Sequence, residues 1–310
     1  MLRSLNSGVS GMKSNQIKMD VIGNNIANVN TTAFKAQRVT FKDILSQTLE
    51  NAAAPTQNLG GSNPKQAGLG VAIASIDTNM NQGALSTTGR ATDLAIEGNG
   101  FFVISDGIEY RFTRDGAFTL DANGSLVTSE GFHVLGSYNT AFLADVYDPA
   151  NPPTVNVDEP AYEPEISAEN SPNITELKSI VIPFEALDEN GTKQKLLSFS
   201  IDKDGTIKGI YGDKTVVIGK VALASFQNPA GLEKLGGNTY RNTANSGAPS
   251  IGLPASSGFG TVRQGLLEMS NVDLAEQFTE MIVTSRAFQA NSRTITTSDE
   301  MLQELLNLKR

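Results

Sequence analysis

The chain ends in the stretch Leu266–Arg310, which reads LLEMSNVDLAEQFTEMIVTSRAFQANSRTITTSDEMLQELLNLKR. This stretch contains neither Gly nor Pro, although the chain of 310 residues has 29 Gly and 12 Pro. Because both residue types disfavour helices, their absence favours one long helix. An apolar residue recurs at every seventh position, which gives the column Leu267, Leu274, Met281, Phe288, Ile295 and Leu302. Such a column predicts a helix lying along a partner helix.

The second column that a coiled coil needs is incomplete. Its members are apolar at the two ends and polar between them: Phe278, Ser285, Ser292, Asp299 and Leu306. The beginning of the chain offers a matching strip, also with a period of seven: Leu5, Met12, Met19 and Ile26, with Ile22 and Val29 beside it. We expect residues 4–29 to form a helix that pairs with the C-terminal one. The alternative is two amphipathic helices packed separately on a globular core.

The middle of the chain changes its period. Phe41, Ile44, Leu45 and Leu49 suggest a second short helix, and residues 51–69 have the composition of a loop. From Val71 the apolar residues alternate, and turn pairs such as Asp-Gly and Asn-Gly follow at 106–107, 115–116 and 123–124. Short apolar runs with this spacing predict an antiparallel meander or barrel. The fold class is therefore α+β, mainly β.

One segment of the β region is strongly acidic. Residues 140–190 hold eleven acids and one base, Lys178, and residues 145–175 are rich in proline. Such a segment is neither a helix nor a central strand, so we expect an exposed insertion. Three nested domains follow: 1–69 with 266–310 as the terminal helical domain, 70–140 with 191–265 as an inner β domain, and 141–190 as an outer insertion or small domain.

Composition excludes several function classes. The chain has no Cys, no Trp and one His, His133, so thiol catalysis and disulfides are impossible. The net charge of −9 argues against nucleic acid as a partner, and no apolar run is long enough for a membrane span. The segments from Asp121 and Asp202 resemble the start of a calcium loop but lack its final Glu, so they predict turns. We expect no catalytic residues, no cofactor, no metal and no enzyme activity.

Two stretches carry a specific resemblance. Residues 23–35, GNNIANVNTTAFK, closely resemble the N-terminal signature of bacterial flagellar rod and hook proteins, and residues 267–275 with 286–293 resemble the C-terminal one. Segments 98–102, 112–118 and 228–232 are similar to the β domain of that family. The signature positions are Asn24, Asn25, Asn28, Thr32, Phe34, Lys35, Ser270, Asn271, Asp273, Arg286, Gln289 and Asn291.

The resemblance implies a role that spacing alone does not give. The terminal helices would form the inner layer of a helical tube, with the columns above as helix and subunit contacts. The chain would assemble with itself and meet the rod, the hook cap and the hook–filament junction proteins. It would leave the cell through the flagellar export apparatus, without a cleaved signal peptide, and be located outside the cell in the hook or basal body.

Within that family the ending of the chain favours a hook subunit, and a distal rod protein is the second interpretation. Two further interpretations come from other classes: a secreted β-rich carbohydrate-active enzyme, and a surface adhesin. The first would need paired carboxylates and an aromatic sugar platform, which the sequence does not display.

Overall fold

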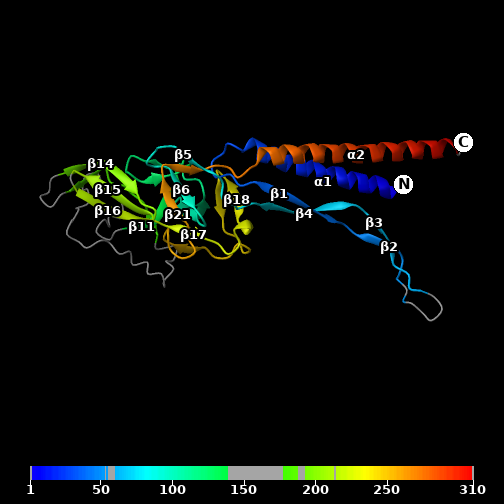
Figure 1. The fold of residues 1–310 in the computed structure, drawn as a ribbon, viewed down its shortest axis with the longest axis horizontal. Coiled ribbons are helices and arrows are strands. Elements are labelled where there is room, and N and C mark those ends of the chain that lie inside the picture. Colours follow the sequence, from blue (N-terminus) through cyan, green and yellow to red (C-terminus); the bar gives the residue numbers. More distant parts are fainter. Residues whose placement is uncertain are drawn as a thin grey trace. The chain divides into compact units, whose positions relative to one another are not determined.

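The computed structural model describes residues 2–52, 54, 60–138, 177–187, 193–212 and 214–308. The chain divides into two compact units, the first made of residues 1–29, 35–79 and 272–310 and the second of 30–34 and 80–271. Figure 1 shows their elements. The acidic segment 145–175 lies outside the described residues, as does all of the expected outer domain except residues 177–187.

The first unit is built on two helices. Helices α1 (Leu2–Ala27) and α2 (Leu274–Asn307) pack side by side, and strands β1 (Gln37–Asp43) and β4 (Val71–Thr78) pack along α1. The two strands pair antiparallel, with Gln37 opposite Thr78 and Asp43 opposite Val71. Strands β2 (Ser46–Glu50) and β3 (Lys65–Gly68) continue this hairpin. The prediction of a helix at each end of the chain is confirmed.

Two sequence-based expectations about these elements are wrong. The short helix predicted around residues 41–49 is absent, because this segment pairs with β4 and β3 as strands β1 and β2. The C-terminal helix begins at Leu274 rather than at 266. Asp273 caps it by accepting from the backbone N–H groups of Ala275 and Glu276. Leu267, the first member of the predicted column, instead lies in strand β22 opposite Ser86.

The second unit is antiparallel β structure, as predicted. It holds β5 (Leu85–Thr87), β6 (Leu94–Glu97), β7 (Phe101–Ser105), β8 (Tyr110–Thr113), β9 (Thr119–Leu120), β10 (Leu126–Val127), β11 (His133–Tyr138), β12 (Lys178–Ser179), β13 (Glu185–Leu187), β14 (Lys193–Ile201), β15 (Thr206–Tyr211), β16 (Lys214–Val221), β17 (Leu223–Ser225), β18 (Glu233–Gly236), β19 (Thr239–Arg241), β20 (Ser250–Gly252), β21 (Thr261–Gln264) and β22 (Leu266–Glu268). Among the described residues, fourteen of the strands form one sheet, along the path β13-β14-β15-β16-β11-β7-β8-β19-β18.

Strand β7 lies at the centre of the core of this unit. All five of its residues are buried, because each face of the strand is covered by a different apolar cluster. Phe102 and Ile104 belong to one cluster, and Phe101 and Val103 to the other. Alternate side chains of a strand point to opposite faces, so a run of apolar residues marks a strand buried on both sides.

Candidate assembly surface

The side of α2 that is turned away from solvent consists of two columns of residues. Within each column the residues are seven positions apart. Met281, Phe288, Ile295 and Leu302 are half-buried and form the predicted apolar column. The second column is one position earlier than expected and is polar: Gln277, Thr284, Asn291 and Ser298. Gln277, Thr284 and Ser298 are the buried residues of α2. We call these four residues the polar column. The sequence predicted this column one position later, because the apolar Phe278 and Leu306 lie at that spacing.

Two glycines of α1 face this contact and let the helices approach closely. A Cβ atom on Gly11 would lie 2.7 Å from Asn291 Nδ2, and one on Gly8 would lie 3.1 Å from Ile295 Cγ1. Gly23, on the same helix, has nothing within 4 Å of its Cβ position. A glycine inside a helix costs about 0.5–1 kcal/mol relative to alanine. At Gly8 and Gly11 the side chains of Ile295 and Asn291 occupy the space next to α1, so a larger residue there would require them to shift.

Polar bonds cross the helix pair at intervals and show that the helices run antiparallel. Near one end Ser4 Oγ lies 3.4 Å from Ser298 Oγ. Further along, Lys18 Nζ lies 3.5 Å from Glu280 Oε2, and both side chains reach solvent. At the other end the buried Asn25 donates from Nδ2 to Gln277 Oε1 at 3.0 Å.

The structure places the predicted packing residues at different depths. Ile22 is buried. The half-buried ones are Leu5, Met12, Met19, Ile26, Val29, Met281, Phe288, Ile295 and Leu302, together with Leu267 in β22. Leu274 and Phe278 are exposed, Phe278 to 50%. Most of the predicted residues are therefore at least partly buried, whereas Leu274 and Phe278 are exposed on α2, and their role in packing stays a prediction.

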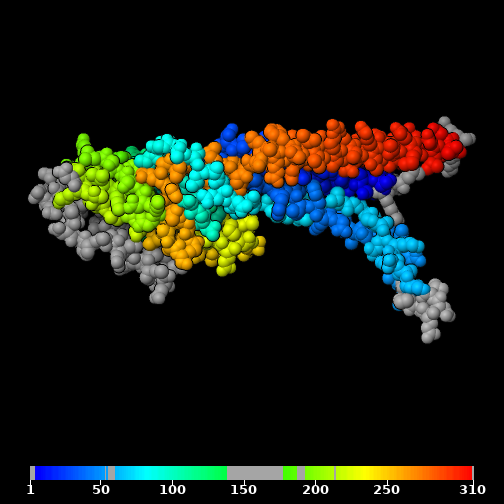
Figure 2. Space-filling model, in the orientation of Figure 1, coloured from blue at the N-terminus to red at the C-terminus, as the bar shows by residue number. Residues whose placement is uncertain are grey.

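The outer surface of α2 carries many other apolar side chains. Figure 2 shows this helix uncovered on the face turned toward the reader. Its exposed large apolar residues are Leu274, Phe278, Ile282, Val283, Met301, Leu305, Leu306 and Leu308. The hairpin strands and the segments next to them add Phe41, Ile44, Leu45, Leu49, Leu69 and Ile76. Since exposed apolar surfaces can mark sites of association, these side chains make the first unit the candidate region for contacts with other chains.

The signature residues of the first unit serve its local structure. Asn28 Nδ2 donates to Asn24 Oδ1 at 2.6 Å, and Asp273 caps α2. Arg286 Nη1 donates to Gln289 Oε1 at 3.2 Å on the exposed side of α2. Lys35 is buried.

The signature residues of the second unit hold the segment 30–34 in place. Phe34 is buried under Lys234, whose Nζ lies 4.2 Å from the ring centroid. Thr32 O accepts from Asn238 Nδ2 at 2.9 Å. Asn271 Nδ2 donates to Asn81 O at 3.0 Å, and the neighbouring Ser270 is half-buried. These contacts are structural, with no arrangement typical of catalysis.

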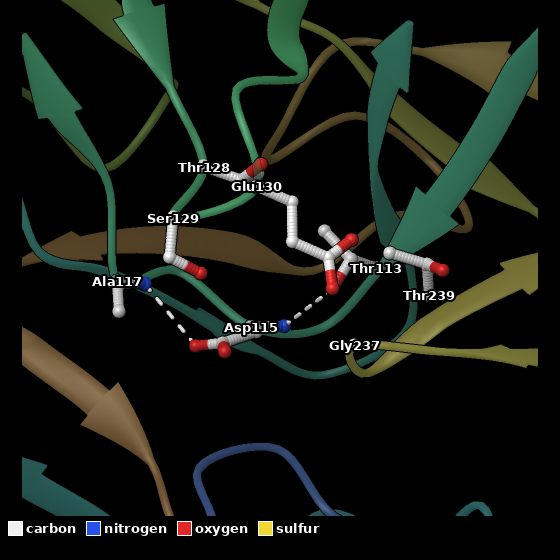
Figure 3. A pocket seen from close by; sticks show the side chains of 8 residues that line it. All are labelled: Thr113, Asp115, Ala117, Thr128, Ser129, Glu130, Gly237 and Thr239. Atoms are coloured by element: carbon white, nitrogen blue, oxygen red, sulfur yellow. Dashed lines mark hydrogen bonds between the residues drawn. The ribbon is translucent and has the colours of Figure 1, made fainter.

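A small polar cavity of about 20 Å³ lies in the second unit (Figure 3). Such a volume holds one water molecule at most. Its lining is Thr113, Asp115, Ala117, Thr128, Ser129, Glu130, Gly237 and Thr239. The backbone N–H of Ala117 donates to Asp115 Oδ1 at 3.2 Å, so this carboxylate serves a turn. Asp121 and Asp202, which the sequence assigned to turns, also accept bonds within their own turns.

No group of three or more His, Asp or Glu residues in the described part of the chain is placed to hold a metal ion. Neither α1 nor α2, as far as their residues are described, is apolar enough over its length to cross a membrane.

Paired terminal helices with exposed apolar side chains, linked to an antiparallel β unit, are typical of a structural protein rather than of a catalytic one. Family models agree with this class and identify it further. Residues 5–35 match the flagella basal body rod protein model, and residues 95–209 match the flagellar hook protein FlgE/F/G D1 domain. Residues 263–308 match the flagellar basal body rod FlgEFG protein C-terminal model.

Individual relatives span the whole chain. The flagellar basal-body rod protein FlgG of Bacillus subtilis is 44% identical over 312 residues, with all of both chains covered. The flagellar hook protein FlgE of Borreliella burgdorferi is 34% identical over 441 residues, and FlgG of the same organism is 37% identical over 313, again with complete coverage of both chains. The chain belongs to the family of flagellar rod and hook structural proteins.

Proposed function

We propose that the chain is the structural subunit of the flagellar hook, which polymerises into a curved, flexible tube that joins rod to filament and transmits motor torque. The comparison within one organism carries this choice. Both Borreliella relatives align with all of this chain, yet 34% of 441 positions is about 150 identities with the hook protein, whereas 37% of 313 is about 116 with the rod protein.

A distal rod subunit is the second candidate, and one observation favours it. The alignments with rod proteins of Bacillus and Borreliella extend over 312 and 313 residues, close to the 310 residues of this chain. The hook alignment of 441 residues requires the hook relative to carry a long additional segment. Length therefore favours the rod, and the number of shared residues favours the hook.

The open surface of the first unit supports assembly in either case. Fully burying a Leu, Ile, Val, Phe or Met side chain is worth about 1.5–3 kcal/mol relative to leaving it exposed. Copies of one chain can cover that surface on each other, and a repeated contact that does not close on itself builds a helical tube. We propose that α1 and α2 form its inner layer and that Leu274 and Phe278 contact neighbouring subunits.

We further propose the nested order expected from the sequence, with its bounds moved to those of the two units: residues 1–29, 35–79 and 272–310 innermost, 30–34 with 80–140 and 191–271 next, and 141–190 outermost. In this proposal the subunit has no enzymatic activity and is exported without a cleaved signal peptide. Its partners are then the rod, the hook cap, the hook–filament junction proteins and the export apparatus.

Genetic complementation separates hook from rod. The chain is expressed in two mutants of one motile bacterium, one lacking its hook protein and the other its distal rod protein. We expect electron micrographs of isolated basal bodies to show curved hooks restored in the first mutant and no change in the second. Restoration of the rod in the second mutant alone would make the chain a rod subunit. Purified protein that forms straight tubes of uniform stiffness would point the same way.

A further inference from the structure

The side chain of Asn25 joins three elements of the first unit. Its Nδ2 donates to the backbone oxygen of Gln37 at 2.8 Å and to Gln277 Oε1 at 3.0 Å. Its Oδ1 accepts from the backbone N–H of Gln37 at 3.0 Å. Asn25 lies in the last turns of α1, Gln37 is the first residue of β1, and Gln277 is in the first turn of α2. Only 1% of Asn25 is exposed.

No other side chain of this size can make the same set of bonds. The side chain of Asn25 forms hydrogen bonds with both the N–H and the C=O of Gln37, as the backbone of a neighbouring strand would. A carboxylate would keep the acceptor but lose the donor, an apolar residue would lose both, and glutamine would place them one methylene further away. Removing one partner leaves buried polar groups unsatisfied, which costs more than the hydrogen bond itself contributes.

A second contact holds the other end of the same ladder. Ser10 Oγ accepts from the backbone N–H of Val71 at 3.3 Å, and a Cβ atom on Gly70 would collide with this hydroxyl. The β1–β4 ladder is thus attached to α1 near Gln37 by Asn25 and near Val71 by Ser10. Beyond Val71 the strands β2 and β3 leave the helices, as Figure 1 shows, and nearly all of their residues are exposed.

We propose that Asn25 is a positioning residue for assembly: it fixes the root of the hairpin and thereby aims the exposed Ile44, Leu45 and Leu49 at a neighbouring copy of the chain. Beyond the attachment at Asp43 and Val71 the hairpin extends about 23 Å to Glu50 at ~3.3 Å per residue. A change of about 10° in the direction of the attached ladder would move this far end by about 4 Å, as much as the distance over which side chains make contact. The part that concerns the neighbouring copy rests on the proposed function.

Hydrogen exchange on the purified full-length chain tests the positioning itself. The variant is Asn25→Ala, and the matched control is Asn24→Ala, which removes an adjacent exposed asparagine whose side chain accepts from Asn28, just after the end of α1. We expect amides of β1 and β4 to exchange at least about tenfold faster in Asn25→Ala, because two bonds to the root of the ladder are lost. Amides of the second unit should keep their wild-type rates, and Asn24→Ala should match the wild type throughout.

A third variant covers the case in which Asn25→Ala opens the whole helix pair. Asn25→Asp keeps the acceptor for Gln37, and its carboxyl regains a donor when protonated. Relative to the wild type at the same pH, protection of β1 and β4 should be lower at neutral pH and recover in acid. Equal exchange in Asn25→Ala and Asn24→Ala, whether slow or fast in both, would overturn the proposal, as would an Asn25→Asp hairpin insensitive to pH.

Because exchange is measured on the free chain, this result does not depend on whether the tube is a hook or a rod. Sedimentation of assembled protein gives the second readout. Asn25→Ala should form fewer tubes than Asn24→Ala at the same protein concentration. Normal assembly of Asn25→Ala with a loosened hairpin would keep the positioning role within the subunit but overturn its role in assembly.

Discussion

Arg114 and Glu268 form an ion pair inside the second unit, with Arg114 Nε 3.5 Å from Glu268 Oε2 and side chains exposed to only 5% and 0%. Arg114 Nη2 also donates to Gly98 O at 2.7 Å, and Glu268 Oε1 accepts from the N–H of Gly83 at 2.9 Å. The backbone oxygen of Glu268 accepts from the N–H of Ala33 at 2.8 Å. One glutamate therefore ties together four segments that are distant in the sequence.

Glu268→Ala should strongly destabilise the second unit. Removing one partner of a buried ion pair leaves the other charge unpaired, which costs about 3–5 kcal/mol. The matched control is Glu97→Ala, which breaks the shorter but exposed pair of Arg263 Nε and Glu97 Oε2 at 2.7 Å. Exposed pairs contribute less than about 1 kcal/mol. Urea unfolding followed by circular dichroism measures both, and equal losses would contradict the role assigned to the buried pair.

The stability of the second unit should fall between about pH 10 and pH 12. Burial and, to a smaller degree, the charge of Glu268 raise the pKa of Tyr240 to about 12, while Arg114 opposes them. An unfolded tyrosine has a pKa near 10. The neutral phenol therefore stabilises the fold fully below pH 10, and this contribution is lost as pH rises through 12. The loss is about 2–3 kcal/mol. Tyr240→Phe should lack this part of the pH dependence when unfolding is measured across the range.

Gly11→Leu should separate the helices, whereas Gly23→Leu should not. A Cβ at position 11 meets Asn291, while one at position 23 meets nothing within 4 Å. Overpacking costs about 1–3 kcal/mol, and replacing an open helical glycine by leucine gains a few tenths to about 1 kcal/mol. The two variants should therefore shift the unfolding midpoint of the helix pair in opposite directions. A stabilised Gly11→Leu would contradict the close approach at this glycine.

Regular periods in the sequence predicted much of this fold. The apolar column of α2 places Met281, Phe288, Ile295 and Leu302 on one face, and the alternation from Val71 onward indicates strands. Both patterns arise because a helix or strand buries one of its faces, so apolar residues recur in the sequence with the period of that element.

Two further features, the strands at residues 41–49 and the polar column of α2, depend on tertiary contacts that leave no periodic pattern in the sequence. Phe41 and Leu49 have helical spacing but are exposed on strands, where pairing with β4 and β3 decides the conformation. The polar column is visible in the sequence as Gln277, Thr284, Asn291 and Ser298, but residue types alone left open whether polar residues such as Asn291 and Ser298 bond to a packed helix or face water. Its buried members Gln277 and Ser298 meet the polar side chains of Asn25 and Ser4 on the opposite helix, which a single strip of residues does not reveal.

Phe288→Asp should open the helix pair and leave the second unit folded. Phe288 belongs to the apolar column and is half-buried. Burying an unpaired carboxylate there costs several kcal/mol. Gln289→Asp, on the exposed neighbouring position, is the control. We expect exchange of α1 and α2 amides to rise in Phe288→Asp alone, together with a loss of tube assembly. A variant that sediments as tubes like the wild type would show that this column is not the packed face.

Ile282→Asp should separate assembly from folding. Ile282 lies on the outer surface of α2 with 62% of the residue exposed, so the free subunit loses little when it is replaced. In a tube that covers this surface, the same carboxylate would be buried without a partner, and each subunit would carry the penalty at every repeated contact.

Thr296→Asp introduces the same charge at another exposed position of α2, outside the set of exposed apolar residues. Circular dichroism and hydrogen exchange should give wild-type values for both variants, while sedimentation should show tubes for Thr296→Asp and free subunits for Ile282→Asp. If both variants formed tubes equally well, the apolar surface around Ile282 would be solvent-exposed in the assembly. The contacts proposed for α2 would then have to involve its other faces.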